Sequence, residues 1–379
     1  MNRPLALLTL AVALAACNSA KRENIQPPRE LVEFAPTVQV DRLWSRGVGD
    51  VGAKPGLQMS VVHADGRLYA ANTDGDLITL DAASGSEIGR IETERNVSTT
   101  PGVGEGAIAV GTIDGELLVY DLTTGAERFT HELSTEIIAA PLIADGRVFV
   151  RSHDGRISAF DLASGARQWV EDNTVPPLSL RGNGALRYDR GHLVFGRDDG
   201  IVVALRADTG NPVWEQRVGL AEGSTDLERL SDADGDIALA DGYAYAVGFE
   251  GQAMAIDVGA GTSLWARDLS AVSGVGYGEH LYVSGANGHV VALDRASGGT
   301  LWTQEGLEHR WPSTPAYAGG HVAVGDLEGY VHWLNPVDGA FAARERVSGD
   351  PIRSAPVAVG DVVYVMSTDG TLAAYRVGG

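Results

Sequence analysis

The sequence predicts an all-β protein: an eight-bladed β-propeller with four antiparallel strands per blade, closed by N- and C-terminal strands that share the last blade. Three observations predict it. A glycine turn recurs eight times, the apolar residues around each turn keep a constant spacing, and the last repeat is one strand short. The turn is an acidic residue or Asn followed by Gly, at residues 74–75, 114–115, 154–155, 199–200, 250–251, 287–288, 328–329 and 369–370.

Apolar residues stand at fixed distances from each of these turns. One lies seven residues before the Gly and another five residues after it, as Leu68 and Leu80 do around Gly75. In the first seven repeats a second Gly follows ten residues later, at positions 85, 125, 165, 210, 261, 298 and 339. Short apolar runs between Gly-containing turns predict β-hairpins, and we expect these Gly residues to take positive φ angles. A four-stranded repeat of this length is typical of a propeller blade.

The two ends of the chain are expected to share the last blade. The final repeat holds only three strands, near residues 354–359, 362–367 and 371–376. Residues 38–44 form an extra strand with no Gly turn before it, and this strand carries Trp44. Other repeats have a Trp four residues after the second Gly, at 169, 214, 265 and 302. We therefore expect residues 38–44 to complete the final blade, and the Trp residues to pack one blade on the next rather than stack on a ligand. Such closure also removes strand edges that would invite aggregation.

Residues 1–16 are typical of a signal peptide. Arg3 precedes a short apolar run, residues 5–14, which is too short to span a bilayer. The run ends in Leu-Ala-Ala-Cys, which resembles the lipobox at which bacterial lipoproteins are cleaved and acylated. Cys17 is the only Cys of the chain, so we predict lipidation there, and Asn18 after it favours the periplasmic face of the outer membrane. The alternative is ordinary secretory cleavage near the alanines.

The rest of the chain divides into a lipidated Cys with a polar tether, residues 17–37, and one propeller domain, residues 38–379. Removal of residues 1–16 takes away Arg3 and leaves 28 basic against 50 acidic residues, a formal net charge of −22. So acidic a surface repels polyanions, which excludes nucleic acid as a partner. A single Cys forms no internal disulfide, so packing has to supply the stability.

Two connections between repeats are longer than the others. The stretch from the second Gly to the next repeat is 17 to 21 residues in five cases, but 25 from Gly165 to Arg190 and 31 from Gly210 to Asp241. If the strands of a blade alternate in direction, both connections lie on the face of the first Gly turns, in adjacent sectors. Insertions in neighbouring loops of one face indicate a binding surface. The alternative is tolerated variation in loop length.

These two connections carry apolar and charged residues suited to a protein partner. The candidate contact residues are Leu178, Leu180, Arg181, Arg229, Asp232 and Asp234. Apolar anchors beside Arg are common at binding hot spots, and clustered carboxylates attract a basic partner. Two alternatives remain open. The two Leu residues could belong to the inner strand of the next blade, and the Arg residues could pair with the Asp residues inside the protein.

Several segments together resemble the β-propeller lipoprotein family of the outer-membrane β-barrel assembly machine, the BamB type. They are Leu-Ser-Leu-Arg-Gly at 178–182, Arg-Leu-Ser-Asp-Ala-Asp at 229–234, Thr-Leu-Trp-Thr-Gln at 300–304 and Val-Gly-Asp-Leu-Glu-Gly-Tyr at 324–330. The resemblance covers essentially the whole chain. It implies a non-catalytic scaffold that binds a periplasmic POTRA domain of the barrel subunit and helps to insert outer-membrane proteins. It carries the subunit contact onto Leu178, Leu180, Arg181, Asp232 and Asp234. The chain departs from the family pattern at residues 235–237, Gly-Asp-Ile, where a Thr/Pro stretch is expected.

Two other classes of function are the alternatives. Pyrroloquinoline-quinone dehydrogenases share this repeat, but they close the cofactor site with vicinal cysteines, which a chain with only Cys17 cannot form. Residues 232–236 resemble the start of a calcium loop, yet the Gly is misplaced and position twelve is Tyr243. We therefore expect no cofactor and no metal. The second alternative is a generic periplasmic hub that binds peptidoglycan or unfolded outer-membrane proteins, the latter by strand addition at a blade edge.

Overall fold

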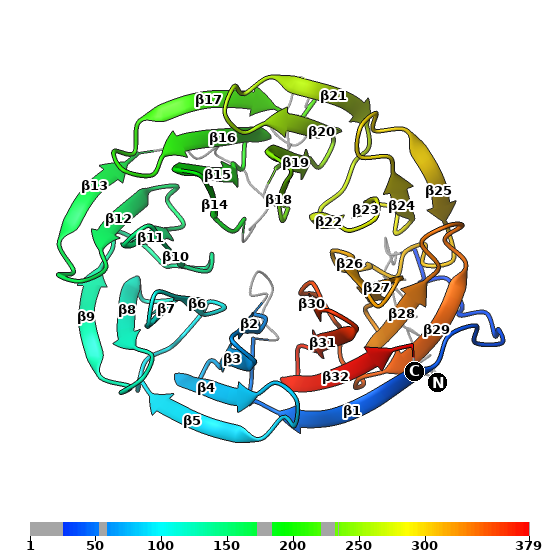
Figure 1. The fold of residues 1–379 in the computed structure, drawn as a ribbon, viewed down its shortest axis with the longest axis horizontal. Helices are drawn as coiled ribbons and strands as arrows, with labels where there is room; N and C mark the ends of the chain where they lie inside the picture. Colours follow the sequence, from blue (N-terminus) through cyan, green and yellow to red (C-terminus); the bar gives the residue numbers. More distant parts are fainter. Residues whose placement is uncertain (1–25, 53–58, 173–183, 221–231, 234, 379) are drawn as a thin grey trace, which may run out of the picture.

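The computed structural model describes residues 26–52, 59–172, 184–220, 232–233 and 235–378, which form a closed ring of eight four-stranded antiparallel sheets (Figure 1). The prediction of an all-β, eight-bladed β-propeller is confirmed. The described residues contain no helix, and thus none that could cross a membrane. In seven blades the strands follow the chain order from the centre of the ring to its rim.

Blades 1 to 4 are built from sixteen strands in chain order. They are β2 (Val62–Ala64), β3 (Arg67–Ala71), β4 (Asp76–Asp81), β5 (Glu87–Glu92); β6 (Gly102–Gly104), β7 (Ala107–Gly111), β8 (Glu116–Asp121), β9 (Glu127–Glu132); β10 (Leu142–Ala144), β11 (Arg147–Arg151), β12 (Ile157–Asp161), β13 (Arg167–Glu171); β14 (Arg187–Asp189), β15 (His192–Gly196), β16 (Ile201–Arg206) and β17 (Pro212–Arg217).

Blades 5 to 8 follow the same plan, with the first strand of the chain in the last blade. They are β18 (Ala238–Ala240), β19 (Tyr243–Val247), β20 (Gln252–Asp257), β21 (Ser263–Asp268); β22 (Val275–Tyr277), β23 (Leu281–Ser284), β24 (Val290–Leu293), β25 (Thr300–Gln304); β26 (Ala316–Ala318), β27 (His321–Gly325), β28 (Tyr330–Leu334), β29 (Phe341–Arg346); β30 (Val357–Val359), β31 (Val362–Met366), β32 (Thr371–Val377) and β1 (Val40–Gly47).

The constant spacing around each first Gly turn arises from the register of the two middle strands. Leu68 is the direct partner of Leu80 across β3 and β4, and the equivalent residues are direct partners in the other seven blades. All sixteen side chains are buried. Directly opposite residues of an antiparallel pair point to the same face of the sheet. The two apolar positions of each repeat are therefore one buried cross-strand pair.

The second Gly of most repeats lies against a large side chain of the preceding blade. At Gly85, whose φ is +69°, a Cβ would lie 2.6 Å from the indole of Trp44. Trp44 Nε1 donates a hydrogen bond to the carbonyl of Ala82, three residues before this Gly, at 3.2 Å. The same arrangement joins Trp169 to Gly210, Trp214 to Gly261, Trp265 to Gly298 and Trp302 to Gly339. The prediction that these Trp residues pack one blade on the next is confirmed.

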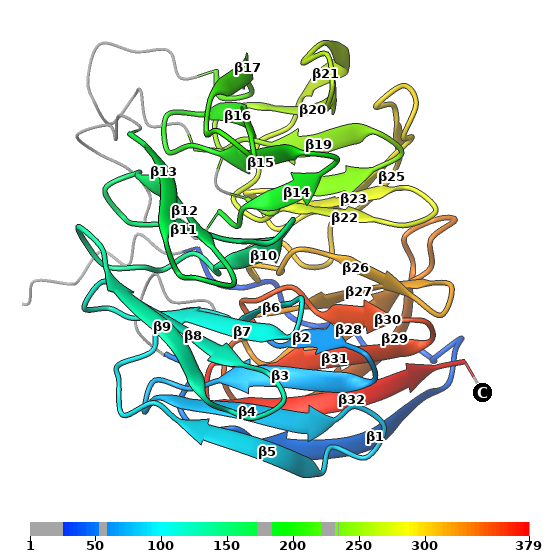
Figure 2. The ribbon, with the colours of Figure 1, turned by 60° about the vertical axis from the view of Figure 1, so that its left-hand side comes forward.

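The ring closes by pairing of the two ends of the chain. β1 lies antiparallel to β32, with Val40 opposite Val377 and Trp44 opposite Ala374 (Figure 2). This places the predicted N-terminal strand in the last blade. We name the face of the ring that carries the eight first Gly turns the loop face, and the opposite face, which carries the second Gly turns, the hairpin face.

The expected positive φ is wrong at the fifth of the first Gly turns. In the other seven turns the Gly has a φ between +74° and +99°, but in blade 5 it is Glu250 that takes a positive φ, +46°. Gly251 instead forms a backbone bridge with Gly219. A Cβ at Gly251 would lie 2.3 Å from the carbonyl oxygen of Val218. Glycine is needed there for close approach to the end of blade 4, rather than for a left-handed turn.

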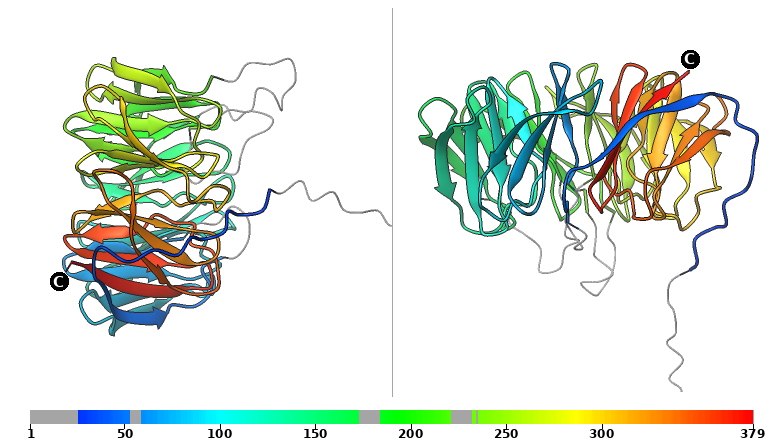
Figure 3. Two further views of the ribbon diagram at one scale, coloured as in Figure 1. Left: turned by 90° about the vertical axis from the view of Figure 1, so that its right-hand side faces the viewer. Right: turned by 90° about the horizontal axis from the view of Figure 1, so that it is seen from below.

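The N-terminal residues before β1 run along the outside of blade 7 (Figure 3). The amide of Arg29 donates to the carbonyl of Glu308 at 3.0 Å, and the amide of Thr37 donates to the carbonyl of Ala342 at 2.9 Å. We name residues 29–37 the strap. This part of the predicted tether is held on the propeller.

Candidate interaction surface

One of the six predicted contact residues, Asp232, lies within the described part of the chain. Leu178, Leu180, Arg181, Arg229 and Asp234 lie outside the described residues, as does the predicted lipidation site Cys17. The stems of both long connections are described, and they show where the connections leave the ring and return to it.

Both long connections leave from the loop face. After β17 ends, the amides of Val218 and Gly219 donate to the carbonyl of Gly200, in the first Gly turn of blade 4, at 2.9 and 2.8 Å. After β13 ends, the Asp172 carboxylate accepts a hydrogen bond from Arg156 Nε at 2.5 Å, beside the first Gly turn of blade 3. The predicted face is therefore confirmed for both stems.

Asp232 occupies a backbone position that recurs around the ring. Its carbonyl accepts a hydrogen bond, at 2.7 Å, from the amide of Phe249, two residues before the first Gly of blade 5. The residues that accept the same hydrogen bond in other blades are Asp50, Asn96, Glu136, Ser270, Arg310 and Pro351. The Asp232 residue is only 6% exposed. It is thus the fixed end of the second long connection, and the extra residues of that connection precede it.

The other end of this connection is bound to the same turn of blade 5. The amide of Leu220 donates to the carbonyl of Glu250 at 2.9 Å, and the amide of Gln252 donates to the carbonyl of Val218 at 2.7 Å. Residues on both sides of 221–231 are therefore hydrogen-bonded to residues 249–252. These hydrogen bonds fix where the second long connection leaves the ring and where it returns to it.

Paired charges lie on the loop face where blades 3 and 4 meet. Arg151 Nη2 donates to Asp198 Oδ1 at 2.7 Å, and the two side chains are 11% and 9% exposed. Arg197 donates to Asp199 and to Glu215 at 2.6 and 3.0 Å. Burial works to lower the pKa of Arg197, but its hydrogen bonds to the two carboxylates outweigh burial, and the pKa is raised. These side chains are already engaged with one another, so they hold the ends of the blades in place.

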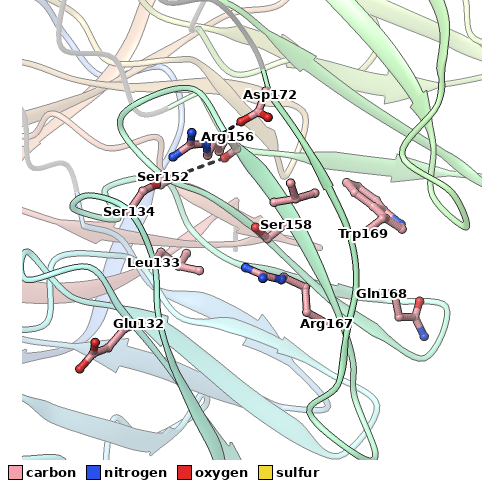
Figure 4. Close-up of a pocket in the computed structure, with 11 residues that line it drawn as sticks. Glu132, Leu133, Ser134, Ser152, Arg156, Ser158, Arg167, Gln168, Trp169 and Asp172 are labelled. Carbon is pink, nitrogen blue, oxygen red and sulfur yellow. Dashed lines mark hydrogen bonds and ion pairs between the residues drawn. The ribbon is translucent and has the colours of Figure 1, made fainter.

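A polar groove with a volume of about 450 Å³ lies between the rims of blades 2 and 3 (Figure 4). Glu132 from β9 and Arg167 and Trp169 from β13 line it, and it extends to Arg156 and Asp172. The first long connection departs after Asp172, so the groove adjoins the candidate surface. Within the described ranges, no three His, Cys, Asp or Glu side chains are placed to hold a metal ion.

The inner strand of blade 4 is β14, which begins at Arg187. Leu178 and Leu180 lie outside the described residues, so both alternatives for them stay open. The structure also shows a third long connection that the sequence count missed. This connection, residues 48–61, links β1 to β2 and has 14 residues. Counted between strands in the same way, the two long connections have 15 residues (172–186) and 20 residues (218–237), and the other five have 6 to 11. In the sequence, the length of each connection is counted from a second Gly, the first of which is Gly85. That count therefore does not include the connection at residues 48–61, which precedes Gly85.

Several relatives match this chain over nearly its whole length. The family model described as outer membrane protein assembly factor BamB matches residues 73–304 and 286–378. The protein of that name from Pseudomonas aeruginosa is 46% identical over 375 residues, which cover 98% of each chain. The one from Xanthomonas campestris is 38% identical over 99% of this chain and 98% of its own. These relatives are named as assembly factors and not as enzymes.

Solved structures show the same fold. The crystal structure of BamB from Moraxella catarrhalis matches with a TM-score of 0.80 and 28% identity, over 89% of this chain and all of the other. A quinohemoprotein alcohol dehydrogenase from Pseudomonas putida matches with a TM-score of 0.71 at 16% identity, over 91% of this chain and 77% of its own. The second likeness shows the propeller fold alone. From the family model and the full-length relatives together, the chain belongs to the family of the outer membrane protein assembly factor BamB.

Proposed function

We propose that this protein is a non-catalytic scaffold lipoprotein of the outer-membrane β-barrel assembly machine. After removal of residues 1–16, the lipid on Cys17 would hold it at the periplasmic face of the outer membrane. It would bind the POTRA region of the barrel subunit through its two long connections and so assist the insertion of outer-membrane proteins. Its full-length relatives are named as outer membrane protein assembly factors.

One observation carries the assignment of the partner surface. The second long connection begins and ends on hydrogen bonds to a single turn, residues 249–252 of blade 5. These hydrogen bonds fix where the second long connection leaves the ring and where it returns to it, which supports a surface at this edge of the loop face. The first long connection leaves the same face one blade earlier. We propose that the two neighbouring connections form one surface.

Within this surface the six residues take different roles. Leu178 and Leu180 would be the apolar anchors, and Arg181, Arg229 and Asp234 would make the charged contacts. Asp232 would hold the base of its loop, since it is buried.

Charge reversal at two of these residues tests this assignment. Arg181→Glu and Asp234→Lys should abolish copurification with the barrel subunit and leave thermal unfolding nearly unchanged. Asp350→Lys is the matched control, since Asp350 is exposed on the same face, between blades 7 and 8. Full copurification of both variants would show that the surface lies elsewhere, and unfolding of the variants would show that the residues are structural.

The lipid anchor and the absence of catalysis have separate tests. Cys17→Ala should release the protein from membranes, and continued attachment would argue against lipidation. Reconstitution with the quinone should give no dye-linked alcohol oxidation, because the chain has no second Cys with which to close a quinone site.

A second candidate function is strand addition by unfolded outer-membrane proteins at the rim. The observation that favours it is a row of exposed apolar side chains on the outer strands of blades 4 to 6. Val213, Leu264 and Leu301 each lie three residues after a second Gly and are 40%, 49% and 47% exposed. Leu264→Lys should weaken crosslinking to an extended client peptide without affecting copurification with the barrel subunit.

A further inference from the structure

A buried cluster of charges lies in blade 7, away from the two long connections. Arg310 is 2% exposed, and Asp326 and His332 are fully buried. Arg310 Nε donates to Asp326 Oδ2 at 2.9 Å, and His332 Nε2 lies 2.9 Å from the same oxygen. Burial alone raises the pKa of Asp326, but the hydrogen bond with His332 and the charge of Arg310 outweigh it, so the pKa is lowered. Asp326 is therefore a buried carboxylate between two basic partners.

The cluster holds the strap by its main chain. Arg310 Nη1 donates to the carbonyl of Arg29 at 2.9 Å. Arg344 Nη1 donates to the carbonyl of Val32 at 3.1 Å, and Arg344 Nε donates to Nδ1 of His332 at 3.1 Å. The carbonyls of Arg29 and Val32 are thus both bound by guanidinium groups that the buried cluster orients. Hydrogen bonds from charged donors are the stronger class.

Apolar contacts hold the strap as well. The ring of Phe34 stacks on Phe341 with centroids 5.6 Å apart, and the guanidinium of Arg344 lies 5.0 Å from the centre of the Phe34 ring. Leu31 packs against the core cluster shared by blades 6 and 7. The strap, residues 29–37, is therefore held on the propeller by both side-chain and main-chain contacts.

The direction of the strap decides from which face the preceding chain departs. Arg29 is bound by Glu308 and Arg310, which belong to the connection between β25 and β26 on the loop face. Thr37 is bound by Ala342 at the start of β29, near the hairpin face. The strap thus crosses the outside of blade 7 from one face to the other (Figure 3). The chain before residue 29 leaves from the loop face.

We infer that the strap orients the propeller on the lipid surface, with the loop face at blades 6 and 7 turned toward the membrane. The inference rests on the proposed lipidation of Cys17. Eleven residues lie between Cys17 and Arg29, on the order of 40 Å of extended chain, whereas a strap free up to Val38 would allow roughly 70 Å. The docked strap therefore shortens the reach of the lipid anchor and makes the anchored chain leave the propeller from the loop face. The anchor and the proposed partner surface then share one side of the ring.

Two labels on opposite faces of the same blade test the orientation. The lipidated protein carrying Asp350→Cys, on the loop face, or Val337→Cys, on the hairpin face, is labelled with a donor dye in vesicles that contain an acceptor lipid. Both positions are exposed, Val337 by 77%, and acylation blocks the thiol of Cys17. We expect stronger energy transfer from position 350 than from position 337. Equal transfer from the two positions would overturn the inference.

A strap-release variant shows whether the strap is the cause. Leu31→Ala combined with Phe34→Ala removes the apolar contacts, and faster hydrogen exchange at the amides of Arg29 and Thr37 reports release. The difference between the two labels should then disappear. Val32→Ala is the matched control, since this side chain is 67% exposed and only its carbonyl is bound. A difference that survives release would assign the orientation to something other than the strap.

The same experiment separates this inference from the proposed function. If the protein carries no lipid and does not stay on the vesicles, both the lipoprotein assignment and the orientation are overturned. If it stays on the vesicles with equal transfer from both labels, only the orientation is overturned. Copurification with the barrel subunit remains an independent readout of the partner surface.

Discussion

Trp302 and Gly339 interlock across the boundary between blades 6 and 7. Trp302 Nε1 donates to the carbonyl of Pro336 at 2.7 Å, and a Cβ at Gly339 would lie 2.4 Å from the indole. The indole therefore fills the space that any other residue at position 339 would need. Five of the eight blade boundaries have this Trp–Gly contact.

Gly339→Ala should lower the free energy of unfolding by about 2–4 kcal/mol, because the new methyl group meets the indole and the residue also has a φ of +73°. Gly320→Ala in the same blade is the control. Its φ is +75° but nothing lies within 4 Å of the added Cβ, so only the backbone cost of about 1 kcal/mol is expected. Urea unfolding of the two variants measures the difference. Equal losses would mean that the indole moves aside.

Trp44→Ala should weaken the closure of the ring. The indole packs on Gly85 of blade 1 and lies 6.0 Å from the ring of Tyr364. Truncation of such a packed Trp costs on the order of 3 kcal/mol. Trp311→Ala, at a side chain that is 72% exposed, should stay within about 0.5 kcal/mol of the parent. Thermal unfolding compares the two, and a Trp44 variant as stable as the Trp311 variant would contradict the role in closure.

Stability should fall as the pH drops below about 6.5 because of His332. Burial lowers the pKa of this histidine in the folded protein, against the opposing effect of Asp326. The unfolded chain then takes up a proton near pH 6.5 while the folded chain does not, so stability is complete above that pH. It is lost below, by up to about 1.4 kcal/mol per pH unit.

His332→Gln should flatten this pH dependence, since Gln can still donate to Asp326 and accept from Arg344 without titrating. His321→Gln, at a less buried histidine of the same blade, is the control for a His-to-Gln change outside the buried cluster. Unfolding in urea at pH 7 and pH 5 gives the slopes. An unchanged slope in the His332 variant would assign the acid sensitivity to another group.

Gly251→Ala should loosen the base of the second long connection. Its Cβ would lie 2.3 Å from the Val218 carbonyl, which accepts the hydrogen bond of Gln252. We expect faster hydrogen exchange at the amides of Leu220 and Gln252 and weaker copurification with the barrel subunit. Gly349→Ala, with nothing within 4 Å, is the control on the same face. Undiminished copurification despite faster exchange would mean that the partner does not need a fixed base.

The sequence predicted those features that repeat. Leu68 and Leu80 stand at positions that recur eight times, so their pairing could be deduced from spacing alone. Trp44 could be placed because its slot was known from other repeats. The positive φ of Glu250 could not be predicted, because it results from contact with the end of blade 4, which belongs to no repeat.

The strap and the surface near Asp232 could not be predicted from the repeats either, because both depend on contacts outside the repeated pattern. The strap precedes the first Gly turn, and its binding depends on Arg310 and Arg344, which are distant in sequence. The lengths of the connections identified the loop face correctly. They did not reveal that Asp232 is buried, because the length of a connection does not show which of its residues is hydrogen-bonded to the ring, as Asp232 is to Phe249 of blade 5.

The pairing of β1 with β32 sets the order in which the molecule can be completed. Val40 and Val377 are neighbours in the sheet but lie at opposite ends of the chain. β1 comes first in the chain and β32 comes last, so β1 cannot take its place in the sheet until the last strand is available. Seven blades can form from contiguous segments, whereas the eighth requires the two ends to meet. The eighth blade therefore closes last. Because the entropy cost of closing a loop grows only slowly with its length, the cost of bringing the two ends together is not prohibitive.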